Sequence, residues 1–403
     1  MKKLLSLLVV LALFVSCKNE VNPPVEDAQP IKLTAVQKQK VVQDNDFAFE
    51  LMKQVLAETD ESNVFISPLS VSIALGMTWN GAIGDTKTEM EKTLKMNGMS
   101  VNEINEYYKL MQTTLPGIDP LTKLSIANSI WYRDIFDVKP DFLQINKDYF
   151  NAEVSSLDFD SPDAPGIINK WCSDKTNGLI PKVIEKIKDE HVMFLINAIY
   201  FKGIWVKQFK KDDTCEGDFI NEQNQSVKVN FMNMTDTFAY AEDEYAQYLE
   251  MPYGNKAFSM TVILPKKSDS FSGLTSDRFN KVLEKMTNEE VAVMLPRFKV
   301  KNKFQLKPML QAMGMQKAFI RIAEFDGMSN LKPLYIDFVQ HDTYVEVTEE
   351  GTEAAAVTTV AMQTESLSSR PYFIANKPFA FVIKEKSTGI ILFMGKMGSV
   401  EKF

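Results

Sequence analysis

The sequence predicts an α+β fold built as one large domain, and three observations carry that prediction. Helical periodicity comes first, at residues 41–94, and short apolar strand-like segments then mix irregularly with further helices. No repeat with a period of about 20 to 50 residues is visible, which excludes solenoids and propellers. The 403 residues, 45% of them hydrophobic, supply enough apolar side chains for one sizeable core.

The N-terminus has the parts of a secretion signal. Lys2 and Lys3 precede an apolar run at 4–15, which is too short to span a bilayer as a stable helix. Cys17 directly follows the small residue Ser16 and resembles the lipidated cysteine of a bacterial lipobox. We therefore expect a lipoprotein signal peptide at 1–16 and a membrane anchor at Cys17, with export across the inner membrane to the cell envelope, outer membrane or cell surface. A plain cleaved signal is the alternative.

The next segment predicts a tether. Residues 17–36 contain Pro23, Pro24 and Pro30 and show little apolar periodicity, so we expect them to be flexible. The folded domain is predicted to begin near Gln37 and to occupy residues 37–403.

Within the domain, periodicity predicts the individual elements. Apolar residues recur at helical spacing over 41–56, and a buried helix over 69–80 and another over 85–94 follow. Short apolar segments bounded by turn residues or charges predict buried strands at 124–132, 194–201, 259–264 and 291–295, and a strand around His341.

Charge and ligand chemistry exclude several function classes. The net charge of −8, with no long basic run outside the N-terminus, disfavours nucleic acid as a partner. Neither His191 nor His341 has metal-binding spacing to another histidine or to a cysteine, so we expect no metal and no cofactor. Cys172 and Cys215 are expected to be unpaired.

The search for a catalytic site gives little. Neither a Gly-x-Ser-x-Gly elbow nor a Gly-x-x-x-x-Gly-Lys loop is present. Ser67 and Ser70 lack an assignable base, and small hydroxyls at the start of a buried helix usually cap it. Glu349 and Glu350 resemble a solvated strand end rather than an acid and base pair. We therefore expect that the protein is not an enzyme.

Residues 345–366 form the most unusual stretch. Between Glu353 and Glu365 there is no charge, and the side chains are small or β-branched, which favours an extended strand. The following residues 367–371 nevertheless indicate an exposed loop. A permanent Ala-rich strand or helix is the alternative interpretation. In an extended strand, one face is free of charge and consists of Thr352, Ala354, Ala356, Thr358, Val360 and Met362.

This stretch and several others resemble the serpin family. The hinge of inhibitory serpins is matched by Glu349, Glu350, Gly351, Thr352, Glu353, Ala354, Ala355 and Ala356. Further family motifs lie in the family's order at 63–70, 197–205, 376–379 and 389–395. The resemblance implies the α+β serpin fold, with a large central sheet, additional sheets, about nine helices and an exposed reactive-centre loop at about 349–371.

The same resemblance implies a mechanism and a set of site residues. A serine-type protease, or also a cysteine-type one, would be trapped as a covalent acyl complex when the cleaved loop inserts into the central sheet. The polar cluster where the sheet opens is matched by Ser67, Ser70, Asn197 and His341, and the point at which the loop enters the sheet by Trp205. The protein is expected to be a metastable monomer, with loop–sheet polymers as a liability.

Counting from Glu349 in the family's usual register places the cleaved bond at Glu365–Ser366. The region after it is slightly longer than in many relatives, and small neighbours would also suit elastase-like enzymes. The rival positions are therefore Thr364, Leu367, Val360 and Met362. Trypsin-like proteases are disfavoured because 351–369 contains no Lys and Arg370 precedes Pro371.

Two other functions compete with inhibition. A non-inhibitory serpin acting as carrier or chaperone predicts a hinge spoiled by proline or bulky charge, which this hinge is not. A surface lipoprotein that binds or processes nutrients predicts an aromatic binding stripe or a catalytic constellation, and the sequence has neither.

Overall fold

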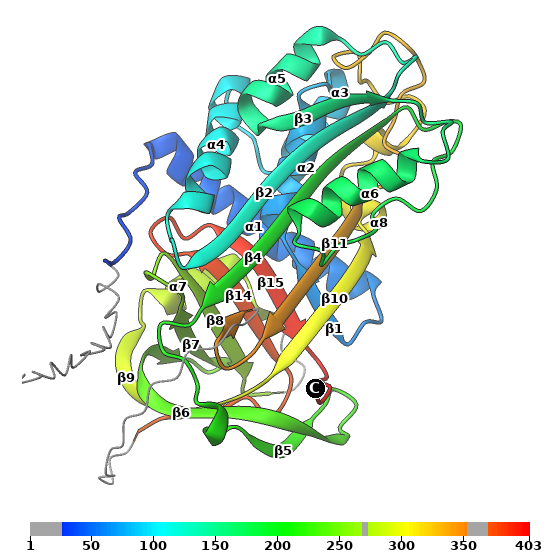
Figure 1. The fold of residues 1–403 in the computed structure, drawn as a ribbon. Coiled ribbons are helices and arrows are strands. Elements are labelled where there is room, and N and C mark those ends of the chain that lie inside the picture. Colours follow the sequence, from blue (N-terminus) through cyan, green and yellow to red (C-terminus); the bar gives the residue numbers. More distant parts are fainter. Residues whose placement is uncertain (1–25, 268–272, 353–369) are drawn as a thin grey trace, which may run out of the picture.

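The computed structural model describes residues 26–267, 273–352 and 370–403. In those ranges it contains eight α-helices around two β-sheets, an α+β architecture (Figure 1). The helices are α1 Ala35–Glu58, α2 Pro68–Trp79, α3 Gly84–Thr93, α4 Val101–Thr114, α5 Pro140–Phe150, α6 Ala164–Lys175, α7 Ser276–Leu283 and α8 Lys307–Ala312. None of these helices is long and apolar enough to cross a membrane.

The larger sheet has nine strands in the order β1-β15-β14-β8-β7-β6-β9-β13, with β5 paired to β6. Its strands are β1 Asn63–Ile66, β5 Cys215–Ile220, β6 Ser226–Glu242, β7 Ala246–Pro252, β8 Phe258–Pro265, β9 Thr287–Pro296, β13 Tyr372–Ile374, β14 Phe379–Glu385 and β15 Ile391–Met397. Every residue of β8 and β14 is buried, as expected for central strands covered on both faces.

The second sheet has six strands in the order β10-β11-β12-β4-β2-β3 and carries the functional site. Its strands are β2 Thr122–Arg133, β3 Ala152–Leu157, β4 Met193–Ile204, β10 Phe298–Gln305, β11 Gln340–Val347 and the two-residue β12 Gly351–Thr352. Burial alternates strictly along β10 and β11, so one face of these strands points into the core.

Local sequence explains where the first helices begin. Thr34 and Gln37 form a reciprocal capping box at the start of α1. Ser67 accepts a hydrogen bond from the amide of Ser70, and Pro68 occupies the first turn of α2. The helices predicted at 41–56, 69–80 and 85–94 are confirmed, with boundaries shifted by one to six residues. The predicted strands are confirmed within β2, β4, β8, β9 and β11.

A main core fills the space between the sheets and helices, and a smaller second core lies between α6 and the six-stranded sheet. The second core includes Trp131, Trp171, Cys172 and Phe194. Helix α6 crosses the outer face of β2 and β4 (Figure 1). The six-stranded sheet is therefore covered by α2 on one side and by α6 on the other.

Part of the predicted tether packs on the domain, which differs from our expectation that it is flexible. The amide of Ala28 donates to the carbonyl of Asn255 at 2.9 Å, and the amide of Ile31 donates to Ser387 Oγ at 2.9 Å. Ala28 and Ile31 also contact the main core. Their apolar side chains stabilise the docked segment, so residues N-terminal to Gln37, among them Ala28 and Ile31, already pack on the domain.

Candidate functional site

The six-stranded sheet is parted between β4 and β11, and β12 lies in the parting. Thr352 pairs with Gly203 of β4 on one side and with Val347 of β11 on the other. Beyond this point, the described residues of β4 pair with β2 and those of β11 pair with β10. Because β12 is antiparallel to both neighbours, β4 and β11 run parallel with room for one strand between them.

A cavity of about 520 Å³ continues the parting away from β12. It is lined by both strands, by residues of α2 and by Cys172 of α6. Burial raises the pKa of the Cys172 thiol to about 12, so this thiol is protonated and inert at neutral pH. Cys172 and Cys215 are both free thiols.

The first two hinge residues are buried, so our expectation of a solvated strand end is wrong. Glu349 is only 1% exposed, and its carboxylate accepts hydrogen bonds from Arg297 Nε at 2.7 Å and from Thr214 Oγ1 at 2.6 Å. Burial alone would raise the pKa of Glu349, but these hydrogen bonds outweigh it and hold the pKa below its ordinary value. Glu350 is buried too and pairs with Lys211 at 2.8 Å.

Thr352 is locked into the sheet by its side chain. It is 2% exposed, and its hydroxyl lies 2.7 Å from the hydroxyl of Tyr253. Gly203 lies opposite, where an added Cβ would come within 2.6 Å of the Tyr253 ring, so only glycine allows this close packing. The part of the predicted exposed loop from 349 to 352 is therefore buried in the sheet, and residues 353–369 lie outside the described residues. Sequence reasoning missed Tyr253, because nothing local marks it as a hinge contact.

The structure places Trp205 directly beside the hinge. Its indole Nε1 donates to the carbonyl of Thr348 at 3.1 Å, and its amide donates to the carbonyl of Glu350 at 2.9 Å. The indole stacks on Tyr253 with ring centroids 4.3 Å apart. Trp205 thus holds the backbone that leads into β12.

Three residues of the predicted sheet-opening cluster, Ser70, Asn197 and His341, line the cavity, and the fourth, Ser67, is hydrogen-bonded to His341. His341 Nε2 accepts a hydrogen bond from the amide of Ser67 at 2.9 Å, and Ser70 Oγ donates to Asn197. Burial lowers the pKa of His341 to about 4, so its ring is neutral at pH 7. Ser67 Oγ donates to the carbonyl of Leu392 at 2.8 Å, so neither serine hydroxyl is paired with the imidazole as a nucleophile would be.

Asn128 and Gln112 extend this cluster, and the sequence analysis did not identify them. Asn128 of β2 accepts a hydrogen bond from Asn197 at 2.7 Å and donates to the carbonyl of Phe150 and to Gln112. The polar chain therefore crosses from α2 through β4 to β2. Because these groups are buried, apart from the half-buried Asn197, and are mutually bonded, they fix the position of β4 relative to α2.

Several predicted residues lie outside the described residues. These are Cys17, Glu353, Ala354, Ala355, Ala356, Val360, Met362, Thr364, Glu365, Ser366 and Leu367.

Comparison with known proteins agrees with this geometry. The family model described as "Serpin (serine protease inhibitor)" matches residues 42–400. An uncharacterized serpin-like protein of Thermococcus kodakarensis is 34% identical, over 88% of this chain and 84% of its own length. The leukocyte elastase inhibitor of Bos taurus is 33% identical, over 88% of this chain and 97% of its own.

Solved structures show the same fold. The thermophilic serpin tengpin in its native state superimposes with a TM-score of 0.84 and 34% identity, covering 93% of this chain and 97% of tengpin. Human thyroxine-binding globulin, solved in complex with thyroxine, superimposes with a TM-score of 0.82 and 27% identity. The match covers 91% of this chain and 100% of the globulin.

Proposed function

Because this chain belongs to the serpin family, whose members are protease inhibitors or carriers rather than catalysts, we propose that it inhibits serine-type proteases by suicide-substrate trapping. A protease serine would attack the carbonyl of the bait residue, forming an acyl-enzyme and releasing the new amino terminus. The freed loop would then enter the six-stranded sheet before water hydrolyses the acyl bond.

The observation that carries this proposal is β12 itself. Gly351 and Thr352 already occupy the strand position between β4 and β11, with antiparallel pairing to both. The cavity beyond them is lined by residues of β4 and β11, and beyond β12 the facing edges of these two strands have no strand partner among the described residues. A strand inserted there would pair with both edges and bury its inward face.

The register of β12 predicts how the loop would continue. Pairing of Thr352 with Gly203, extended along β4, brings Thr358 opposite Asn197 and Met362 opposite Met193. Extended along β11 from Val347, the same register brings Thr358 opposite His341. The uncharged face of the loop would then point inward like Thr352, and the hydroxyl of Thr358 would meet the polar cluster.

The composition of the loop suits this route. Side chains between Glu353 and Glu365 carry no charge, and all except Met362 and Gln363 are small or β-branched, so they would pass between two strands without a large desolvation cost. We propose Glu365–Ser366 as the cleaved bond, with a protease that accepts an acidic residue. An elastase-like protease is the second choice, supported by similarity to the leukocyte elastase inhibitor.

A carrier function is the alternative, favoured by the structural likeness to human thyroxine-binding globulin. A carrier does not need loop insertion, so its function would place no constraint on the sequence of the hinge. Instead the buried part of the hinge, Glu349 to Thr352, is bonded to Arg297, Lys211 and Tyr253. These contacts support the inhibitory proposal, because they position the segment that must enter the sheet.

We also propose that the protein is exported and anchored in the cell envelope through a lipid on Cys17. The support is the order of basic, apolar and small residues before Cys17. In this setting the partners would be target proteases and the membrane, and the folded unit a monomer.

Incubation with proteases tests the function. Residues 18–403 would be mixed separately with a glutamate-specific and an elastase-like protease, and the products run on denaturing gels. A covalent band near the summed mass, with a released peptide that begins at Ser366, is expected. Cleavage in the loop by both proteases without any covalent band, and without a gain in heat stability, would favour the carrier function instead.

A further inference from the structure

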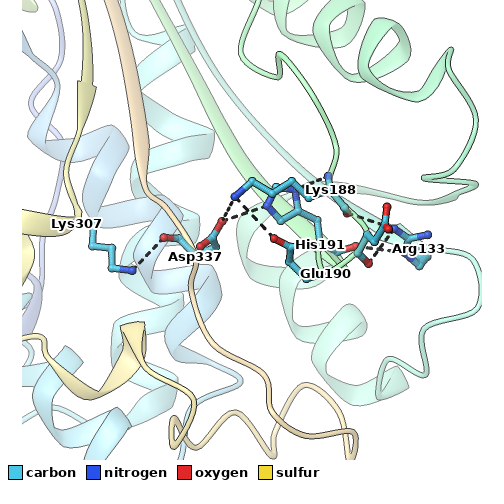
Figure 2. Close-up of polar contacts among 7 residues, drawn as sticks. Arg133, Lys188, Glu190, His191, Lys307 and Asp337 are labelled. Atoms are coloured by element: carbon cyan, nitrogen blue, oxygen red, sulfur yellow. Dashed lines mark hydrogen bonds and ion pairs between the residues drawn. The ribbon is translucent and has the colours of Figure 1, made fainter.

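A cluster of charged groups bridges the two halves of the parted sheet at the end farthest from the hinge. Asp337 precedes β11, and Lys188 and His191 precede β4 (Figure 2). Asp337 Oδ2 lies 3.2 Å from His191 Nε2 and 3.4 Å from Lys188 Nζ. We call these three residues the far-end clasp.

Both sides of the clasp are held in place by neighbouring elements. Arg133, at the end of β2, donates from Nε to the carbonyl of His191 at 3.2 Å and from Nη2 to the carbonyl of Lys188 at 3.4 Å. Lys307, at the start of α8, donates to the carbonyl of Asp337 at 3.2 Å (Figure 2). The clasp therefore joins the β2–β4 half of the sheet to the β10–β11 half.

The hydrogen bonds assign the state of the imidazole. The amide of Lys188 donates to His191 Nδ1 at 3.2 Å, so Nδ1 is an acceptor and Nε2 carries the proton that faces Asp337. A neutral ring satisfies both contacts. Burial alone would raise the pKa of Asp337, but His191 and Lys188 outweigh it and keep the pKa below its ordinary value.

The groups around the clasp are charged or apolar. Glu190 lies 3.8 Å from Lys188 of the clasp itself, on the same side of the parting, whereas Glu185 pairs with Lys303 of β10 at 3.3 Å. The rings of Phe194 and Phe338 flank the imidazole, with centroids 5.3 and 5.7 Å away. Asp337 is thus the group of the clasp that joins β11 to the β4 side.

The clasp lies across the path of the inserting loop. The register of β12 brings Met362 opposite Met193 on β4 and opposite Asp337 on the β11 side. An inserted strand separates its two neighbours by two strand spacings, about 9.5 Å. The side-chain contacts of Asp337 with His191 and Lys188 cross this path, and seating the last loop residues between the two segments would break them.

We propose that the far-end clasp is a brake on complete loop insertion, with Asp337 as its positioning residue. This inference rests on the proposed inhibitory function. The hinge contacts would govern how insertion begins, and the clasp would govern how fast it is completed. The clasp also stabilises the uninserted form and would not contribute to the inserted one.

Replacement of Asp337 tests this role. In Asp337→Asn, we expect spontaneous insertion on mild heating to be about fivefold faster than in the unmodified chain, a modest factor because Asp337 is 39% exposed. Insertion is followed as the fraction of protein that resists unfolding on a urea-gradient gel. The melting temperature of the uncleaved form should fall, whereas that of the loop-cleaved form should not change.

Asp326→Asn is the matched control. Asp326 is 33% exposed and pairs with Lys332 at 2.8 Å, but both residues belong to one segment and do not bridge the sheet. Its insertion rate should equal that of the unmodified chain within experimental error. Equal insertion rates in the two variants, or equal losses of melting temperature before and after loop cleavage, would overturn the brake.

Two further measurements keep the test decisive. If Asp337→Asn does not fold, Lys188→Gln removes one exposed cation of the clasp and should insert about twofold faster, and an unchanged rate would overturn the proposal. The unmodified chain should gain heat stability on loop cleavage. Failure of that gain refutes loop insertion itself, whereas a normal gain with equal rates refutes only the clasp.

Discussion

Replacing Thr352 by arginine is the sharpest test of the hinge. Thr352 is almost fully buried between Gly203 and Val347, and its hydroxyl is bonded to Tyr253. An arginine there would place an unpaired charge in this packed site, at a cost of several kcal/mol. The uncleaved Thr352→Arg variant can avoid this cost, because β12 can leave the sheet.

The cost to the native form is therefore limited to the contacts of β12. A few backbone hydrogen bonds and one side-chain hydrogen bond, at about 1 kcal/mol each, give a loss on the order of 3 kcal/mol. For a domain of this size we expect the melting temperature to fall by roughly 5 °C. Loop insertion after cleavage cannot avoid burying the arginine, because residue 352 is the first residue of the inserting strand.

If the barrier to loop insertion rises by about 3 kcal/mol, insertion becomes roughly 100-fold slower. Hydrolysis of the acyl-enzyme is then faster than insertion. Thr352→Arg should behave as a substrate: mixed with the target protease, it should be fully cleaved and leave active protease. The control is Thr352→Val, which keeps the shape, loses the Tyr253 hydrogen bond and should still trap the protease. A stable covalent complex formed by Thr352→Arg would refute this reasoning.

Two further predictions rest on buried groups of the structure, and a third rests on the N-terminal sequence. Arg297→Gln should lower the free energy of unfolding by about 2 kcal/mol, because it removes the cation beside buried Glu349; an unchanged urea midpoint would contradict this. Between pH 6.5 and about 4, the unfolded state takes up a proton that buried His341 does not, so stability should fall with falling pH by up to about 3 kcal/mol; His341→Gln should flatten that part of the stability curve. Cys17→Ala should move the protein from the membrane fraction to the soluble fraction and abolish labelling by a fatty acid, and membrane retention of the variant would argue against the anchor.

The sequence predicts best what depends on neighbouring residues. The start of α2 is visible from Ser67 and Pro68, because a cap and a first-turn proline act within one helical turn. Short apolar segments locate β4 and β11, because a buried strand needs apolar residues bounded by turn residues or charges. The resemblance to serpins then identifies residues that the structure brings together, such as Ser70 and Asn197.

Burial of the hinge could not be predicted in this way. Glu349 is stabilised by Arg297 and Thr214, which are 52 and 135 residues away in the chain. A carboxylate pair after a strand usually indicates solvent, and only these remote partners reverse that expectation. The far-end clasp has the same character, since Asp337 and His191 are 146 residues apart.

The docked segment 26–34 sets how far the protein would stand from a membrane. Asp27 pairs with Lys256 at 2.8 Å and Ala28 is bonded to Asn255, so the chain is secured to the domain from its first described residues. If Cys17 carries a lipid, the nine residues 17–25 lie between the lipid and the docked segment, and a chain of that length spans at most roughly 30 Å. We would expect an inhibitor held this close to the membrane to meet only proteases within a thin layer above it. It would inhibit proteases that act on that surface rather than those in the surrounding fluid.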